Sequence, residues 1–517
     1  PFLMDCPALL AKLPLARHAD QISKALLQER NLLLMAPTGT GKSSFLPWFL
    51  HSQGDLRIAM LQPRRIAALS LCGFLAKALG EEPGALVGYS FRFETKKSAV
   101  THILFQTYGS FLQGVLSGKG DRFDWILFDE FHERRTDMDL LLSWCLAWQK
   151  AAPQNAPRIA VLSADLQRQE LETLLGVPCL EIQSPGFPVQ TLHQEPKLSE
   201  SLDRQVLRAL RTLQGNGIWN TTLVFLPGKS EIQSCAHLLE DELRGLQAPE
   251  ILRLFGGQDG VEQARIFADT EAPRVILTTN IAETSLTVPQ VTAVVDSGLE
   301  RNAEFDATRN IPVLRLGRIA LQNAVQRMGR AGRTRAGVCV RLWSERDQVN
   351  LAANIQPEIL RCRLDIPLLQ HAALASRLTL PSDALRWPTP PPKELSQKNQ
   401  QELNALGFLD GEGNITPSGL SALQIPVQSL EVTRLLLSTQ DRNEALLACA
   451  AWLDAGSESL FLRSGESQNL LDLARDLLMD RRGLSRDIAL QYQQIRRWAE
   501  SQGKIAAWPQ NLHTTLR

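Results

Sequence analysis

Several features that mark other classes of protein are missing from this chain. Its eight cysteines form no CxxC pair and have no histidine-rich neighbourhood, which argues against a zinc site and a disulfide framework. No run approaches about 20 uninterrupted apolar residues, and the N-terminal PFLMDCPALL lacks the basic flank and apolar core of a signal peptide. We therefore expect a protein of a reducing cytoplasm that is neither secreted nor membrane-spanning.

An excess of charge is also missing. With 55 basic and 55 acidic residues the chain has no global positive field, so any nucleic-acid binding must depend on a local groove. No short repeat and no low-complexity segment is present. A length of 517 residues with 44% apolar residues instead predicts several folded domains.

Short apolar runs rich in β-forming residues recur between helical stretches. Strands of this kind, buried on both faces, are typical of a parallel sheet covered by helices, so the expected fold class is α/β. One set is predicted at residues 32–36, 56–61, 124–129 and 158–163. A second set is predicted at residues 222–226, 251–255, 274–278, 291–296 and 338–343. The two sets predict two α/β domains in tandem.

Changes in composition predict where the domains meet. The SPGFPV segment at residues 184–189 has the prolines and glycine of a linker, so we place the domains at residues 1–189 and 190–348. The strand pattern then fades, and a WPTPPPK interruption precedes a tail rich in leucine and alanine at helical spacing. A third domain is predicted at residues 349–426 and a helical bundle at 427–517.

A predicted strand leads directly into the loop APTGTGKS. Such a loop directs backbone N–H groups at phosphate oxygens near a helix N-terminus. Lys42 would approach the terminal phosphates, and Ser43 would bind Mg²⁺. The loop therefore predicts a nucleoside triphosphate site, with ATP expected by abundance; a glycine-rich turn that carries Lys-Ser by chance is the weaker alternative. The predicted binding residues are Thr38, Gly39, Thr40, Gly41, Lys42 and Ser43.

Two carboxylates follow another predicted strand, in the sequence DEFH. Asp129 would hold Mg²⁺ through water, and Glu130 would polarise the attacking water as general base. Adjacent carboxylates on their own more often belong to a solvated loop. Together with the phosphate loop they predict hydrolysis.

The third catalytic element is QRMGRAGR, which contributes Gln326 and places Arg330 and Arg333 on one predicted helical face. Guanidinium groups directed at a γ-phosphate stabilise the transition state and contribute about 10³ to 10⁵ in rate in related enzymes. These residues belong to the second domain, so ATP is expected between the two domains. The alternative is a solvated basic face.

These motifs, in this order, resemble superfamily 2 helicases of the DEAH/DExH group, and most closely the bacterial HrpB-like branch. The resemblance spans about residues 13 to 460 and includes QPRRIAA, GYSFRFE, LVFLPGKSEI and TTNIAETSLTV. It implies two RecA-like domains followed by winged-helix and ratchet-like helical domains. It also implies ATP-driven movement, 3′ to 5′, along single-stranded nucleic acid, with RNA favoured over DNA. The family's C-terminal extension is not recognisable before Arg517, so truncation is expected.

The resemblance further assigns roles to individual residues. It implies that His132, Ser163 and Asp165 couple the nucleotide to the strand, and that Phe267 stacks on adenine. Contacts with the nucleic-acid backbone are implied for residue types that bind phosphate and sugar and carry little sequence information. These residues are Arg64, Arg65, Thr107, Thr279, Asn280 and Thr284.

Three positions depart from the family pattern. Asp165 stands where threonine is usual, and its carboxylate would either bond to His132 or repel the DEFH carboxylates. Tyr108 replaces a carboxylate near the strand path and is either neutral or a stacking surface. Phe74 stands where an arginine is expected beside adenine, and it is either a second stacking ring or a core residue.

Three functions remain open at this point. The first is an ATP-dependent RNA helicase or translocase. The second is a nucleic-acid-stimulated ATPase clamp or remodeller without strand separation, which Asp165 and Tyr108 favour. The third, a binding scaffold with a decayed ATP site, is disfavoured because every catalytic residue named above is present. No motif for a protein partner is visible.

Overall fold

The computed structural model describes residues 6–37, 39–91, 94–118, 120–164, 168–183, 186–218, 220–244, 248–255, 265–268, 270, 272–283, 288–306, 311–427, 429–439, 443–455, 474, 477–478, 486–503 and 505. It divides into two compact units. The first contains Pro1–Gly114 with Gly120–Cys362, and the second contains Val115–Lys119 with Arg363–Arg517.

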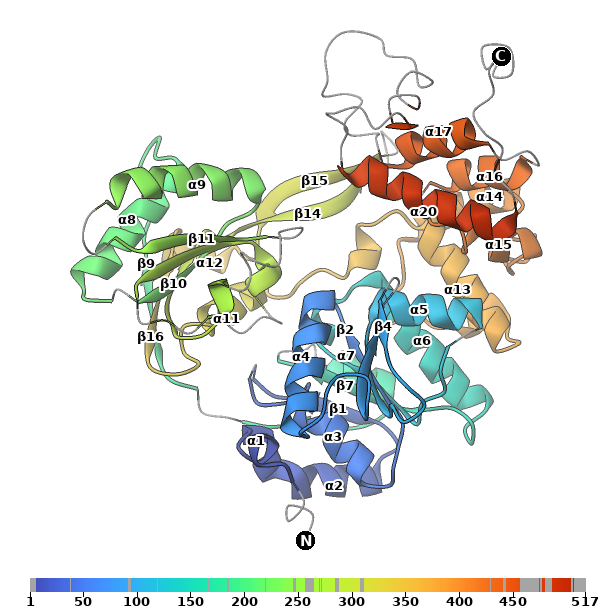
Figure 1. Cartoon of the computed structure of the whole chain (residues 1–517), viewed down its shortest axis with the longest axis horizontal. Helices are drawn as coiled ribbons and strands as arrows, with labels where there is room; N and C mark the ends of the chain where they lie inside the picture. Colours follow the sequence, from blue (N-terminus) through green and yellow to red (C-terminus); the bar gives the residue numbers. More distant parts are fainter. Residues whose placement is uncertain are drawn as a thin grey trace. The chain divides into compact units, whose positions relative to one another are not determined.

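The first α/β domain is built on an eight-stranded sheet of order β4-β3-β5-β2-β6-β7-β1-β8, shown in blue to cyan in Figure 1. All neighbouring strands are parallel except β3 and β4. The strands are β1 Leu32–Met35, β2 Ile58–Gln62, β3 Val87–Ser90, β4 Thr95–Lys96, β5 Ile103–Thr107, β6 Trp125–Phe128, β7 Arg158–Ser163 and β8 Cys179–Glu181. The helices are α1 Ala8–Ala11, η1 Pro14–His18, α2 Ala19–Gln28, α3 Phe45–Ser52, α4 Arg65–Ala78, α5 Tyr108–Ser117, η2 Phe131–Glu133, α6 Thr136–Ala151 and α7 Arg168–Leu175.

The second α/β domain has a six-stranded, all-parallel sheet of order β11-β12-β10-β13-β16-β9. The strands are β9 Val189–His193, β10 Thr221–Phe225, β11 Glu250–Leu254, β12 Arg274–Thr278, β13 Val291–Asp296 and β16 Gly337–Arg341. The helices are α8 Leu202–Gly215, α9 Lys229–Glu242, η3 Asn280–Ala282, α11 Leu321–Met328, α12 Glu345–Val349 and η4 Glu358–Leu360. An antiparallel hairpin, β14 Leu299–Asp306 with β15 Ile311–Arg318, extends from this domain.

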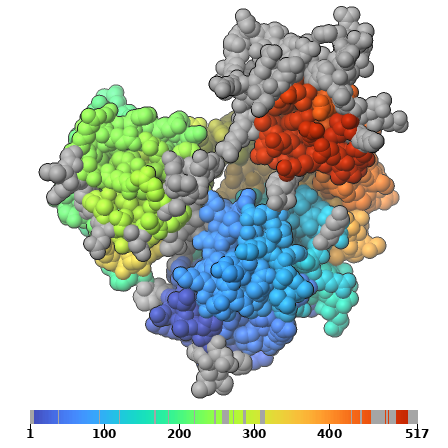
Figure 2. Space-filling model, in the orientation of Figure 1, coloured from blue at the N-terminus to red at the C-terminus, as the bar shows by residue number. Residues whose placement is uncertain are grey.

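Alternation along each strand buries both faces of the second sheet. Val224 of β10 packs with α8 and α9 on one face, whereas its neighbours Leu223 and Phe225 pack in a separate cluster on the other. Burial on both faces is the reason that these strands are continuous apolar runs and pair in parallel. In Figure 2 this domain, in green to yellow, forms a continuous body in the space-filling view.

The second unit is helical. Its helices are α13 Asp365–Arg377, η5 Ser382–Ala384, α14 Lys393–Ala405, α15 Pro417–Ala422, α16 Leu430–Ser438, α17 Glu444–Ala455 and α20 Arg486–Gln502. A single antiparallel bridge between Leu409 and Ile415 accompanies them among its described residues. In the part of the chain that the structure covers, no helix is both long and apolar enough to cross a membrane.

The predicted α/β fold class with two parallel-sheet domains is confirmed. Each predicted strand is present within a few residues of its expected bounds. The finer domain boundaries, including a winged-helix domain at residues 349–426 and a bundle at 427–517, stay predictions.

Candidate active site

The glycine-rich loop connects β1 to α3. Gly39 and Gly41 have φ values of 84° and 100°, a left-handed conformation that glycine adopts without steric cost. Lys42 is buried, and its Nζ donates to the carbonyl oxygens of Ala36 and Pro37 within the loop. Burial lowers the pKa of Lys42, whereas the nearby carboxylates act to raise it. Thr40 is also buried, and Thr38 lies outside the described residues.

The two DEFH carboxylates follow β6, beside β2 in the same sheet. Asp129 is 1% exposed, and its Oδ2 accepts a hydrogen bond from Nε2 of Gln62 at 2.6 Å. Burial, together with the charge of Glu130, raises the pKa of Asp129 to about 6. Glu130 has a φ of 53°, a left-handed conformation that is uncommon outside glycine and recurs at functional sites.

This arrangement fits a hard divalent cation. Mg²⁺ prefers oxygen ligands and retains several waters. The Ser43 hydroxyl is near enough to the Asp129 carboxylate to act on its pKa, and burial beside Glu130 disfavours the ionised carboxylate, which a bound cation would stabilise. Among the described residues, Oε2 of Glu130 is buried without a hydrogen-bond donor. Such an oxygen is available to a water molecule.

The predicted coupling residues His132 and Ser163 are in contact. Nδ1 of His132 lies 3.2 Å from Oγ of Ser163 and 3.5 Å from Oε2 of Glu130, and all three side chains are buried. The end of β6 is thereby connected to the end of β7. Asp165, which stands where the family has threonine and was predicted to interact with His132 or with the DEFH carboxylates, lies outside the described residues.

The two arginines of the QRMGRAGR motif lie within the electrostatic range of Glu130. Burial lowers the pKa of both Arg330 and Arg333, that of Arg333 to about 10, and the negative charge of Glu130 acts on both in the opposite direction. Gln326 is a further buried group: both polar atoms of its side chain lack a hydrogen-bond partner among the described residues. The predicted catalytic side chains of the two α/β domains therefore share one electrostatic environment.

The prediction that Arg330 and Arg333 share a helical face is wrong. The helix α11 ends at Met328, and both arginines lie in the turns that follow it. Gly329 and Gly332 interrupt the motif, and glycine disfavours helix continuation by about 1 kcal/mol relative to alanine. Arg330 is held in the turn because its Nε donates to the carbonyl oxygen of Glu283 at 2.8 Å.

Arg327, in the same motif, was not predicted to matter. Its side chain is 1% exposed and donates to Oε2 of Glu283 and to Oδ1 of Asp296, each at 2.9 Å. The Asn323 amide also donates to Glu283. These bonds fix α11 against β13 and against the segment that carries Thr279 and Asn280. Local pattern gives no signal for them, because the two carboxylates are 44 and 31 residues away.

Arg64, a predicted nucleic-acid contact, is engaged with the protein. Its Nη1 donates to the carbonyl oxygens of Asn280 and Ile281, each at 3.2 Å, and its Nη2 lies 3.4 Å from Oε1 of Glu133. Thr279 precedes Asn280 at the start of η3. Arg64 thus joins three motifs, a position suited to coupling as well as to strand contact.

The other predicted contacts lie at strand ends or on the surface. Arg65 is half-exposed and forms an ion pair with Glu94. The Thr107 hydroxyl, at the end of β5, donates to Oγ of Ser110 at 2.8 Å and accepts from its backbone N–H at 3.3 Å. Thr284 lies outside the described residues.

For two aromatic residues that depart from the family pattern, the structure decides between the alternatives given above. Tyr108 is 1% exposed and its hydroxyl donates to the carbonyl oxygen of Asp129 at 2.7 Å, so the stacking alternative is wrong. Phe74 is 38% exposed on α4, so the core alternative is wrong for it. Phe267 is half-buried and packs against the core of the second domain. Contact of either phenylalanine with adenine stays a prediction.

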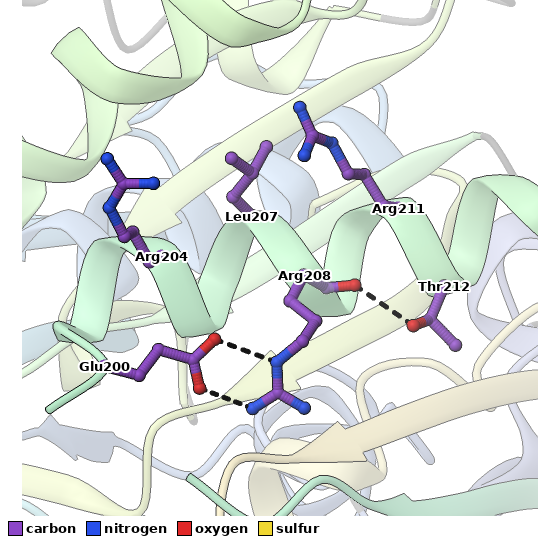
Figure 3. Close-up of a pocket in the computed structure, with 6 residues that line it drawn as sticks. All are labelled: Glu200, Arg204, Leu207, Arg208, Arg211 and Thr212. Atoms are coloured by element: carbon purple, nitrogen blue, oxygen red, sulfur yellow. Dashed lines mark hydrogen bonds and ion pairs between the residues drawn. The ribbon is translucent and has the colours of Figure 1, made fainter. Parts of the chain in front are cut away.

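A cavity elsewhere in the second domain is not part of this site. It has a volume of about 450 Å³ and is lined along α8 by Arg204, Leu207, Arg208, Arg211 and Thr212 with Glu200 (Figure 3). Arg208 binds the Glu200 carboxylate at 2.9 and 2.6 Å, which neutralises part of its charge. None of the predicted site residues lines it.

Comparisons with known proteins agree with this geometry. Residues 17–174 match the DEAD/DEAH box helicase family, and residues 204–335 match the helicase conserved C-terminal domain. The mouse ATP-dependent RNA helicase DHX33 is 30% identical over 83% of this chain and 63% of its own length. The human probable ATP-dependent RNA helicase DHX34 is 32% identical over 88% of this chain and 41% of its own length.

Solved structures give the same result. The crystal structure of Escherichia coli DEAH/RHA helicase HrpB superposes with a TM-score of 0.82 at 27% identity, over 96% of this chain and 62% of that chain. A second, of E. coli DExH-box NTPase HrpB, gives 0.78 at 28% identity, over 96% and 60%. This chain therefore spans less than two thirds of the length of the relatives it matches.

Proposed function

This chain belongs to the DEAD/DEAH-box helicases, with an HrpB-like fold, and from this premise we propose that it is an ATP-dependent RNA helicase or translocase. One observation carries the proposal: Lys42, Asp129 and Glu130 of the first domain are buried close enough for their charges to act on one another, and the charge of Glu130 also acts on Arg330 and Arg333 of the second domain. A decayed scaffold would have no reason to retain this set.

Each residue of the set has a defined part in hydrolysis. The loop N–H groups and Lys42 hold the phosphates, which requires the ammonium to leave the carbonyl oxygens it now binds. Ser43 and Asp129 would hold Mg²⁺, which would neutralise part of the phosphate charge. Glu130 accepts a proton from the attacking water through Oε2, which accepts no hydrogen bond from the described residues and lies 3.5 Å from Nδ1 of His132.

The second domain completes the site from the other side. Arg330 and Arg333 stabilise the negative charge of the transferring phosphoryl group, and Gln326 orients the water through its amide, which has no hydrogen-bond partner among the described residues. Desolvation makes these charges more effective than they are in water.

Coupling to the strand follows from the contacts of two residues. His132 contacts both Glu130 and Ser163, so a change at the catalytic base is felt at the end of β7. Arg64 contacts Glu133 of the first domain and the carbonyl oxygens of Asn280 and Ile281 of the second. A movement of the second domain would therefore change the contacts of Arg64 in the first. Thr107, Thr279, Asn280 and Thr284 would then grip the nucleic-acid backbone with little sequence preference.

The substrate, direction and compartment are also part of the proposal. Two relatives are named as RNA helicases, which favours RNA over DNA. We expect 3′ to 5′ movement and a cytoplasmic location, the latter supported by eight cysteines without a disulfide. A partial duplex with a 3′ single-stranded tail should be separated with ATP, whereas the same duplex with a 5′ tail should not.

A second function, an ATPase clamp that does not separate strands, is favoured by the presence of Asp165 in place of threonine. The duplex assay distinguishes the two. RNA-stimulated hydrolysis without release of either strand, from either tail, would support the clamp. Asp165→Thr should then raise strand release if the carboxylate is what prevents it.

A further inference from the structure

A cluster of side chains of types that bind metals lies at the amino ends of two strands of the first sheet, whereas the glycine-rich loop lies at the carboxyl end of a strand. His51, Asp55 and His102 each offer one ligand atom, and these atoms lie within 4.8 Å of one another. Asp55 and His102 lie just before the parallel strands β2 and β5, at their amino ends. The glycine-rich loop, Asp129 and Thr107 all follow the carboxyl ends of strands in this sheet. The cluster is therefore a separate site from the catalytic one.

Backbone hydrogen bonds place two members of the cluster next to each other. His51 is in the last turn of α3, and the N–H groups of Gly54 and Asp55 both donate to its carbonyl oxygen, at 3.2 and 3.0 Å. This turn places Oδ1 of Asp55 3.8 Å from Nε2 of His51. Asp55 has a φ of 56°, a left-handed conformation that aspartate and asparagine tolerate better than most residues.

The hydrogen bonds leave the histidine nitrogens in a state suited to a metal. Nδ1 of His51 lies 2.9 Å from the carbonyl oxygen of Leu56, so in the neutral ring it carries the proton and donates. The lone pair is then on Nε2, which faces Asp55 at 3.8 Å. A histidine ligand commonly has its other nitrogen bound to a carbonyl oxygen in this way.

His102 supplies the second nitrogen. Its Nδ1 lies 3.0 Å from Oδ1 of Asp55 and is buried, yet among the described residues no acceptor is aligned with it as a hydrogen bond requires. Two ligands bound to one tetrahedral Zn²⁺ at about 2.0 to 2.2 Å lie about 3.3 Å apart. The nitrogen and oxygen are thus at a spacing close to that of two ligands of one ion. The His51 and His102 rings meet edge to face at 5.3 Å.

We propose that His51, Asp55 and His102 bind a divalent transition-metal ion, Zn²⁺ in the first instance, as a site distinct from the magnesium site of hydrolysis. Two imidazoles and one carboxylate suit zinc, whereas Mg²⁺ prefers oxygen alone. The fourth position is left to water. The ion joins the end of α3, the helix that follows the glycine-rich loop, to the start of β5.

The chain of residues 1–517, stripped of metal with a chelator, should be titrated with ZnCl₂ and separately with CoCl₂. We expect one Zn²⁺ per chain and a Co²⁺ visible spectrum of tetrahedral nitrogen and oxygen ligands, without a thiolate charge-transfer band. His102→Ala and Asp55→Asn should each weaken Zn²⁺ binding at least tenfold. Asp55→Asn retains the left-handed turn and the exposed position, so it separates loss of a ligand from loss of the fold.

The matched control is His237→Gln, which removes an exposed histidine of α9 and should leave Zn²⁺ binding unchanged. Equal binding by His102→Ala, Asp55→Asn and the unaltered chain would overturn the proposal, as would a thiolate band with Co²⁺. Neither readout depends on ATP hydrolysis, so this site and the catalytic proposal stand or fall separately.

Discussion

Glu130 occupies a left-handed backbone position, is almost fully buried, and keeps one carboxylate oxygen free of hydrogen bonds within the described structure. These three properties are costly for a residue with no task, because a buried unpaired polar atom and a strained φ each destabilise the fold. In its neighbour Asp129, both carboxylate oxygens accept hydrogen bonds. Oδ2 accepts from Nε2 of Gln62, and Oδ1 accepts from the backbone N–H of Glu130. This difference supports the proposed division of roles, in which Asp129 would hold the metal and Glu130 would take the proton.

Glu130→Gln should reduce the ATPase rate by about 10² to 10⁴, because the amide fills the same space but cannot accept the proton. Binding of a fluorescent ATP analogue should be retained, since the loop and Lys42 are untouched. The control is Glu242→Gln, an exposed carboxylate of α9 that pairs with Arg211. A Glu130→Gln chain that hydrolyses ATP at the normal rate would remove this residue from the chemistry.

His371 of α13 provides a pH-dependent property of the second unit. Burial lowers its pKa from 6.5 to about 4, while its Nε2 lies 2.9 Å from the carbonyl oxygen of Leu385 and its ring stacks on Trp387 at 4.7 Å. As the pH falls below 6.5, His371 becomes protonated in the unfolded chain, whereas in the folded chain it stays neutral until the pH is about 4. Stability of this unit should therefore decrease over that interval, by up to about 3 kcal/mol.

Hydrogen exchange of the α13 amides between pH 7 and pH 4, corrected for the intrinsic rate, measures this effect. His371→Gln keeps a donor for Leu385 but cannot titrate, so its opening free energy should vary less with pH. An identical pH dependence in the two proteins would show that other groups are responsible.

At the scale of elements, α11, β13 and the η3 segment are joined by the buried Arg327 with its two carboxylates. Burial and the charges of Asp296 and Glu283 act on this guanidinium in opposite directions, and the carboxylates dominate, so its pKa is raised. The turn that carries Arg330 and Arg333 follows directly from α11. Its position therefore depends on this buried set.

Removal of the Arg327 guanidinium should strongly lower the stability of the second domain. Arg327→Ala leaves two buried carboxylates without a cation, and loss of one partner from a buried ion pair costs about 3 to 5 kcal/mol. Native-state hydrogen exchange of the β13 amides measures the loss. Arg346→Ala, which removes an exposed arginine of α12, should change stability by less than about 0.5 kcal/mol. A similar small change for Arg327→Ala would show that this guanidinium does not hold α11 in place.

The elements that could be predicted from the sequence are those encoded locally. The apolar runs of β1, β6 and β10 and the loop at Gly39 to Ser43 are contiguous signals, and the structure contains them. The hairpin of β14 and β15 was missed, because its charged and apolar residues give no clean alternation. Gln62 was missed as a partner of Asp129 because their contact requires the order of the strands, in which β2 pairs with β6.

At the scale of the molecule, the proposed mechanism takes one catalytic set from both α/β domains. Ser43, Asp129 and Glu130 come from the first, and Gln326, Arg330 and Arg333 from the second. A site divided in this way hydrolyses ATP only when both domains are correctly placed, and Arg64 connects the two through Asn280 and Ile281. Binding of a strand to both domains should therefore stimulate hydrolysis.

The ATPase rate of the purified chain, measured alone, with single-stranded RNA and with single-stranded DNA of the same sequence, tests whether the two domains share one catalytic site. We predict hydrolysis that RNA stimulates more than DNA, and that is lost in Glu130→Gln and in Arg330→Ala alike, although these residues belong to different domains. Hydrolysis that persists in Arg330→Ala at the unaltered rate, or that no nucleic acid stimulates, would contradict a catalytic site shared between the two domains of an RNA-dependent motor.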